Sequence, residues 1–171
     1  MKTKRQEGFS LIELLIVVAI IGIIAAIAIP NLLASRRAAN EGSAQSSLRT
    51  IHSAQATFQA TTGNGAFAAL GGAGVVHGDG SANLLGQSLI DPVLGTGVKS
   101  GYNFTMIQNV APAVGVLAQF TAQADPQTDA GVSQSGTRHF CVSEEGVMRG
   151  AAGTAAIADR AACTALTALG N

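Results

Sequence analysis

The sequence predicts an α+β protein, in which a long N-terminal α-helix packs on a small antiparallel sheet of three to four strands. Three observations predict this class. An apolar run over residues 9–29 is followed by helical periodicity that reaches about residue 62. A glycine-rich connection comes next, and segments with alternating apolar side chains are found only beyond residue 100. The order of helix, connection and meander predicts the architecture.

The chain has 171 residues, a formal net charge of zero and only 12% charged residues. This length suits one modest domain with an appendage. No basic face of the kind that holds nucleic acid is present. Aromatic residues make up 4% of the chain, so the core is expected to consist of small residues with a few Leu, Ile, Val and Phe side chains.

As a helix, residues 9–29 would be about 31 Å long. This length matches the hydrocarbon thickness of a bilayer, about 30 Å. The run is apolar on every side, so it is expected to face lipid or similar helices. Pro30 follows the run and is expected to kink the helix there. A carboxylate inside the run, Glu13, is out of place in such surroundings.

Three interpretations of the N-terminus remain open at this point. A secretory signal peptide would use the basic residues 2–5, but its apolar region would be too long and Glu13 would be unusual. A plain membrane anchor explains length and charge, yet it leaves Glu13 at a cost of up to ~3 kcal/mol. In the third interpretation, a leader is removed between Gly8 and Phe9.

Cleavage at that point gives Glu13 a partner. The new α-amino group of Phe9 lies four residues before Glu13, a spacing that places two residues on one helix face. Between chains stacked with an axial offset, Glu13 of one chain meets the amine of its neighbour. A paired carboxylate is penalised much less than an unpaired one. The charge would therefore select one register among helices that otherwise slide freely.

Residues 1–33, with a basic leader ending in Gly8 and then "FSLIELLIVVAIIGIIAAIAIPNL", resemble a type IV prepilin. The resemblance implies that a membrane aspartyl peptidase removes residues 1–8 and methylates the amine of Phe9. It also implies an assembly role for Glu13. The family contains pilus subunits, minor or competence pilins, and the pseudopilins of type II secretion.

The same resemblance implies that Gly22 and Pro30 weaken the helix, so that it loosens on assembly. Residues 9–30 would form the membrane-spanning helix that becomes the filament core. Residues 31–62 would continue as an amphipathic half whose apolar stripe contacts the globular head, residues 63–171. The members of that stripe are Leu48, Ile51, Ala54 and Phe58.

Within the globular head, residues 63–100 form a glycine-rich connection with short apolar segments and room for one short helix. Its "GDGS" at residues 78–81 favours a tight turn over a calcium site, because too few acidic ligands lie nearby. Residues 101–149 are expected to form the sheet. The Tyr102 and Phe120 faces of that sheet would cover the helix stripe, and its last two strands would form a hairpin.

Cys141 and Cys163 are the two cysteines of the chain. In an exported protein they are expected to form a disulfide, which would contribute roughly 3 kcal/mol. Two free, buried thiols in a cytosolic protein are the alternative. The resemblance implies a disulfide-bounded C-terminal region, here the alanine-rich tail at residues 150–171.

No catalytic constellation is found, so the chain is not expected to be an enzyme. His52, His77 and His139 are far apart in the sequence and form no HExxH pattern, and both a phosphate loop and GxSxG are missing. We expect neither a metal nor another cofactor. His139 is expected to face outward from its strand, and Asp125 to lie in a turn or cap.

The sequence therefore predicts a structural subunit of a type IV pilus, which serves in adhesion, motility or DNA uptake. It would wait as a single-pass protein of the bacterial inner membrane and then join a surface filament of many copies. Its partners would be membrane lipid, a prepilin peptidase and an inner-membrane assembly platform, with no small-molecule substrate. The alternatives are a secretion pseudopilin and a membrane-anchored binding protein that does not polymerise.

Overall fold

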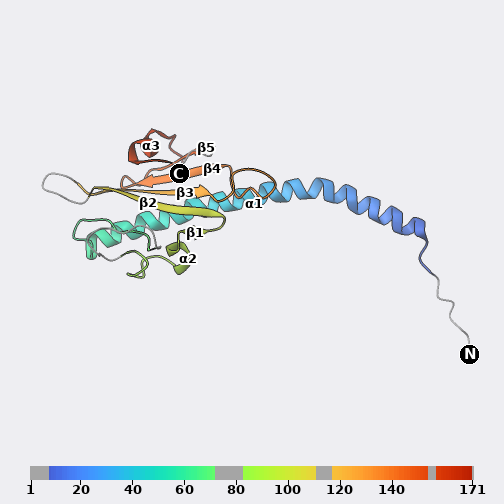
Figure 1. Cartoon of the computed structure of the whole chain (residues 1–171), viewed down its shortest axis with the longest axis horizontal. Helices are drawn as coiled ribbons and strands as arrows, with labels where there is room; N and C mark the ends of the chain where they lie inside the picture. Colours follow the sequence, from blue (N-terminus) through green and yellow to red (C-terminus); the bar gives the residue numbers. More distant parts are fainter. Residues whose placement is uncertain (1–7, 72–82, 111–116, 154–156, 171) are drawn as a thin grey trace, which may run out of the picture. The chain divides into compact units, whose positions relative to one another are not determined.

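The computed structural model describes residues 8–71, 83–110, 117–153 and 157–170. The chain divides into two compact units, an N-terminal unit (Met1–Arg36) and a C-terminal unit (Arg37–Asn171). The elements, labelled in Figure 1, are α1 (Leu11–Thr61), α2 (Pro92–Gly95), β1 (Val98–Lys99), β2 (Tyr102–Val110), β3 (Gln119–Pro126), β4 (Arg138–Ser143), β5 (Met148–Ala152) and α3 (Arg160–Ala165).

The N-terminal unit consists mainly of the apolar part of α1. Between Leu11 and Ile29, the large apolar side chains are 47–76% exposed. Among the described residues, α1 is the one helix that is long and apolar enough to cross a membrane, by length and composition. The helix begins at Leu11, two residues later than the sequence suggests, and its helical backbone continues through Pro30.

The C-terminal unit contains a sheet of five strands in the order β1-β2-β3-β4-β5, and all neighbouring strands are antiparallel. The sequence predicts three to four strands, and the additional one is β1. With two residues, β1 is too short to show an alternating pattern. Ser100 and Gly101, with φ of 51° and 75°, form the tight turn that pairs it with β2. Such turns need a positive φ at both central residues, which suits glycine.

One face of the sheet packs on the stripe of α1. Leu48 and Ile51 are fully buried in a core that also contains Tyr102 and Phe120 from the sheet. The predicted stripe is confirmed, because each of its four members is at most 5% exposed. The burial of apolar area here is the main stabilising contribution to the C-terminal unit.

The connection after α1 contributes to the same core through Leu70, Leu84 and Ile90. Gln55, a buried residue of α1, fixes its path. The Gln55 side-chain amide donates to the Ala68 carbonyl oxygen at 2.5 Å and accepts from the Ala68 N–H at 2.9 Å. Because both backbone groups of Ala68 are satisfied, the loop can lie against the helix without a penalty for buried polar atoms. Residues 78–81 lie outside the described residues.

The opposite face of the sheet is polar and yet buried. The segment with α3 lies over it, on the other side of the sheet from α1 (Figure 1). The expectations that His139 faces outward and that Asp125 lies in a turn or cap are both wrong. His139 is only 4% exposed, and Asp125 is a half-buried residue within β3. Alternation along β4 assigns His139 correctly to the face opposite the helix, but the C-terminal tail covers that face.

Replacing Leu48 with alanine is expected to lower the free energy of unfolding by about 2–5 kcal/mol, because a fully buried leucine leaves a cavity that its neighbours fill only in part. Urea denaturation of the full chain in detergent, followed by circular dichroism, measures the change. Leu117→Ala is the matched control, since it removes the same atoms from a side chain that is 86% exposed. Its effect is expected to stay within about 0.5 kcal/mol. Equal losses in the two variants would contradict the assigned core.

Asp125 makes the stability of the C-terminal unit depend on pH. Burial raises the pKa of the Asp125 carboxyl, and the nearby His139 lowers it by less. A raised pKa in the folded state means that stability is fully present below the unfolded pKa, near 3.8, and is lost as pH rises through the folded value.

Asp125→Asn removes this loss, so the variant is expected to be more stable than the unaltered chain at pH 7 and equal to it near pH 3. Urea titrations at the two pH values measure the difference. Asp129→Asn, the same substitution at an exposed position, is the control for loss of an aspartate and is expected to change stability by no more than about 0.5 kcal/mol. A constant difference at both pH values would overturn the assignment.

Candidate functional site

The predicted cleavage point lies in exposed backbone just before α1. Gly8, Phe9 and Ser10 are outside the helix, and Phe9 is 83% exposed. Apart from its chain neighbours, no described atom lies within 4 Å of the position that a Cβ would take on Gly8. Exposed, non-helical segments are the ones that proteases reach most easily. The bond between Gly8 and Phe9 is therefore open to a peptidase.

Glu13 lies in the first turn of α1 and contacts the start of its own helix. The Ser10 N–H donates to Glu13 Oε2 at 3.0 Å. This bond is one half of a capping box, in which a Glu three residues after Ser satisfies an unpaired donor of the first turn. A carboxylate at this end is also stabilised by the helix dipole. This capping role of Glu13 was not predicted, although the Ser-x-x-Glu spacing at Ser10 and Glu13 indicates it.

The capping bond leaves part of the Glu13 carboxylate available. Only Oε2 is engaged, and within the part of the chain that the structure describes Oε1 has no hydrogen-bond partner. In the uncleaved chain Phe9 is not helical, so the predicted alignment of Phe9 with Glu13 on one face is not formed. An amine at Phe9 would be one residue away from the Ser10 N–H that Glu13 already holds.

Gly22 and Pro30 both lie inside the helix, where neither residue favours helical structure. A Cβ at Gly22 would meet no atom within 4 Å, so packing within the described chain does not require glycine there. Glycine in a helix interior costs roughly 1 kcal/mol relative to alanine. Gly22 therefore lowers the local stability of α1 without a packing gain among the described residues, and Pro30 lowers it by removing one backbone donor of the helix.

At the other end of the chain, the disulfide between Cys141 and Cys163 is present and confirms the predicted pairing. The two Cα atoms are 6.0 Å apart, and the bond links β4 to α3. Ile157 and the half-buried Leu166 pack around it in a second, smaller core. The disulfide therefore holds the C-terminal segment on the sheet.

Ion pairs form a second link between α3 and the sheet. Arg160 Nη2 lies 2.6 Å from Glu144 Oε1 and 2.9 Å from Glu145 Oε1. The hydrogen bond to Glu144 raises the pKa of Arg160, which keeps the guanidinium charged. Asp159 caps α3 by accepting from the Ala162 N–H at 2.8 Å. These contacts position Arg160 beside the turn between β4 and β5.

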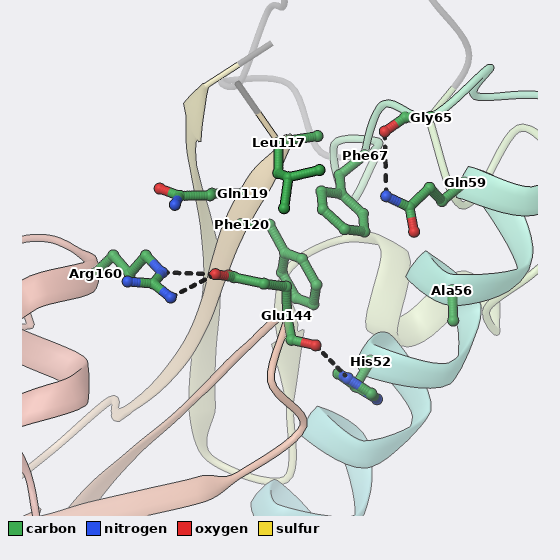
Figure 2. A pocket seen from close by; sticks show the side chains of 11 residues that line it. His52, Ala56, Gln59, Gly65, Phe67, Leu117, Gln119, Phe120, Glu144 and Arg160 are labelled. Atoms are coloured by element: carbon green, nitrogen blue, oxygen red, sulfur yellow. Dashed lines mark hydrogen bonds and ion pairs between the residues drawn. The ribbon is translucent and has the colours of Figure 1, made fainter. Parts of the chain in front are cut away.

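Arg160 and Glu144 also border a pocket of about 630 Å³ in the C-terminal unit. Figure 2 shows Phe67 and Phe120 side by side in its apolar part, with ring centroids 4.6 Å apart. Its full lining is His52, Ala56, Gln59, Gly65, Phe67, Leu117, Ala118, Gln119, Phe120, Glu144 and Arg160. This pocket could not be predicted from the sequence, because segments far apart in the chain build it and no motif marks them.

The pocket has little net charge, since the carboxylate of Glu144 and the guanidinium of Arg160 neutralise each other. His52 Nε2 lies 3.5 Å from the Glu144 carbonyl oxygen, and the His52 ring is tilted against Phe120 at a centroid distance of 6.1 Å. Within the described ranges, no group of three or more His, Cys, Asp or Glu side chains is placed to hold a metal ion. The arrangement suits a neutral, largely apolar occupant.

Comparisons with known proteins give one family and several relatives. Residues 3–29 match the prokaryotic N-terminal methylation motif. The chain is 50% identical to the type IV major pilin protein PilA of Myxococcus xanthus over 54 residues, an alignment that covers 32% of this chain and 24% of that protein. It is 63% identical to the type IV wide pilus major component PilA4 of Thermus thermophilus over 38 residues, and this alignment covers 22% of this chain and 29% of that protein.

A further relative is the type II secretion system core protein G of Aeromonas hydrophila, 35% identical over 54 residues, with 32% of this chain and 38% of that protein covered. The chain thus spans well under half the length of each of these relatives. No solved structure matches it significantly. With this motif, its long apolar helix, its antiparallel sheet and its disulfide, the chain resembles type IV pilin-like proteins, a class of pilins and pseudopilins. Within it, the two pilins share more identity with this chain than the secretion protein does.

Replacing both Cys141 and Cys163 with alanine is expected to lower the free energy of unfolding by about 3 kcal/mol, because the unfolded chain regains the entropy of a loop of about two dozen residues. Urea denaturation of the full chain in detergent measures the loss. Reduction of the unaltered chain should give the same loss, and reductant should leave the double variant unchanged. If the two treatments differ, the effect comes from the substituted side chains and not from the cross-link.

Proposed function

We propose that this chain is the structural subunit of a type IV pilus. The observation that carries the proposal is the N-terminal segment. It combines a match to the methylation motif, an exposed non-helical junction at Gly8 and Phe9, and an apolar run at the start of α1 in which Glu13 is the single carboxylate. These are the features that a subunit needs if it is first cut and then packed by its helix among identical helices.

In this proposal residues 1–8 are a leader that a prepilin peptidase removes, and the new amine of Phe9 is methylated. Residues 9–30 span the inner membrane once and later form the filament core. Residues 31–62 are the amphipathic half of the helix, and residues 63–171 are the globular head. The exposed apolar side chains of α1 support this division, because water is a poor solvent for them and lipid or neighbouring helices are good ones.

Glu13 directs docking through its two oxygens. Oε2 accepts from the Ser10 N–H and keeps the carboxylate at the helix start. Oε1 is then oriented to accept from the α-amine of Phe9 in a neighbouring subunit. An unpaired carboxylate in a membrane costs about 2.5–3.5 kcal/mol, and this cost falls when an amine pairs with it. The register that joins the two groups is therefore favoured over all others.

Packing has to contribute the rest of the selectivity. Moving an apolar helix from lipid into a filament core gains little from the hydrophobic effect, because both surroundings are apolar. Close helix contacts and the carboxylate–amine pair decide which arrangement forms. The further partners of this route are membrane lipid before assembly and an inner-membrane assembly platform that inserts the subunit into the surface filament.

A pseudopilin of a type II secretion system is the second candidate, supported by the identity of 35% to core protein G. The higher identity to the two pilins favours the pilus. A membrane-anchored binding protein that does not polymerise is the third candidate. It explains the apolar helix, but it gives Glu13 no role beyond its own helix cap.

Glu13→Gln and Glu13→Val together test the proposal. Glutamine keeps an oxygen that accepts from the Ser10 N–H but loses the charge, and valine loses both. If pairing with an amine drives docking, both variants are expected to lack surface filaments, as measured by electron microscopy of sheared cell-surface material. Leader removal, followed by mass spectrometry of the membrane fraction, should continue in both. Normal filaments with Glu13→Gln would show that only the cap matters.

The mature N-terminus is the second readout. Filaments of the unaltered chain should contain a subunit that begins with a methylated Phe9. Asp91→Asn, outside the apolar run, is the control for loss of a carboxylate and is expected to retain filaments, because asparagine can still cap α2. A subunit that still begins with Met1, or that begins after Pro30, would rule out the proposed route.

A further inference from the structure

Two large apolar side chains stand out on the surface of the C-terminal unit. Leu117 is 86% exposed and Val132 is 80% exposed, more than any other large apolar side chain described in this unit. They lie at opposite ends of β3, because Leu117 comes two residues before Gln119 and Val132 six residues after Pro126. An eight-residue strand is about 26 Å long, so the two side chains belong to separate surfaces.

Val132 is presented by a loop that hydrogen bonds hold in place. The loop, residues 127–137, joins β3 to β4. The Arg37 guanidinium donates to Gln134 Oε1 at 2.8 Å, and the Asn40 amide donates to the Ser135 carbonyl oxygen at 2.9 Å. Residues 129–133 at the tip are all exposed. Because the loop is anchored on α1, little further ordering is needed when the tip meets a partner.

Leu117 marks the other surface, the rim of the pocket described above. Below it lie Phe67 and Phe120, which offer an apolar floor. The Glu144–Arg160 pair borders this floor, so an uncharged side chain entering the pocket leaves no charge without a partner. The volume of about 630 Å³ exceeds that of one valine side chain, and residues 130–133 are small enough to enter together.

We propose that the tip of this loop, with Val132 as its anchor, docks into the Leu117 pocket of a second copy of the chain. The proposal rests on the proposed function, since it describes how heads of adjacent subunits contact one another. The loop tip and the pocket are different surfaces of the subunit, so the contact is heterologous and does not close on itself. Repeated contacts of this kind build open filaments.

The distance along α1 between the loop anchor and the pocket is compatible with contacts to two neighbouring subunits. The loop is anchored at Asn40, and the pocket is lined by Ala56. Sixteen residues of helix separate them, about 24 Å. A subunit can therefore hold one neighbour at each end of its sheet at the same time. The head contact adds a second selection of register to the one made by Glu13.

Cysteine cross-linking in filaments of the full chain tests this contact. The double variant Leu117→Cys with Val132→Cys is oxidised and separated without reductant. A ladder of dimers, trimers and longer species is expected, about tenfold stronger than for either single variant, because docking raises the effective concentration of the two thiols. The native cysteines are paired in a buried disulfide and do not take part. Leu117→Cys with Val93→Cys is the matched control, since Val93 is also exposed but lies on α2.

The outcomes separate this inference from the proposed function. A ladder as strong in the control pair as in the test pair would overturn the head contact, and so would intact filaments without any ladder. Dimers formed equally by Leu117→Cys alone would indicate a symmetric contact and would also overturn it. In each of these cases filaments still form, so the pilus assignment stands. Absence of filaments from the unaltered chain would instead refute the proposed function.

Discussion

The packing of one apolar stripe of α1 on the sheet is the interaction on which the rest of the C-terminal unit depends. Leu48, Ile51 and Phe58 are buried against aromatic side chains from the sheet. The same helix carries, in its first part, apolar side chains on every side. One uninterrupted helix is thus suited to two surroundings, lipid or other helices in one part and a soluble sheet in the other.

With α1 on one face of the sheet, the segment that contains α3 covers the other face. Covering that face costs free energy, because it buries polar atoms. Among the described atoms, Thr121 Oγ1, Gln123 Oε1 and Ser143 Oγ have no hydrogen-bond partner. The disulfide and the Arg160 ion pairs offset this cost and hold α3 on the sheet. The tail also extends the sheet edge, where the Leu169 N–H donates to the Met148 carbonyl oxygen at 2.8 Å.

In the proposed assembly, the start of α1 and the C-terminal unit each contribute a contact between subunits. Glu13 is restrained by its own helix cap, so its remaining oxygen is oriented before a neighbour arrives. Val132 and the Leu117 pocket are likewise held by contacts within the subunit. Preorganised groups lose little entropy on docking, and therefore more of their interaction energy is available to select a register. Weak helix contacts in an apolar setting need such selection.

The sequence by itself determined the features that depend on neighbours along the chain. The apolar run, the stripe of Leu48 and Phe58, the hairpin of β4 and β5, and the Ser10–Glu13 spacing are all periodic or local, so residue spacing reports them. Tertiary structure alone decided which surfaces become covered. His139 and Asp125 are partly or fully buried because a distant segment with α3 lies over their face, and the pocket exists because separate segments meet there. Local pattern assigns a side chain to a face, whereas burial depends on the long-range contacts that cover that face.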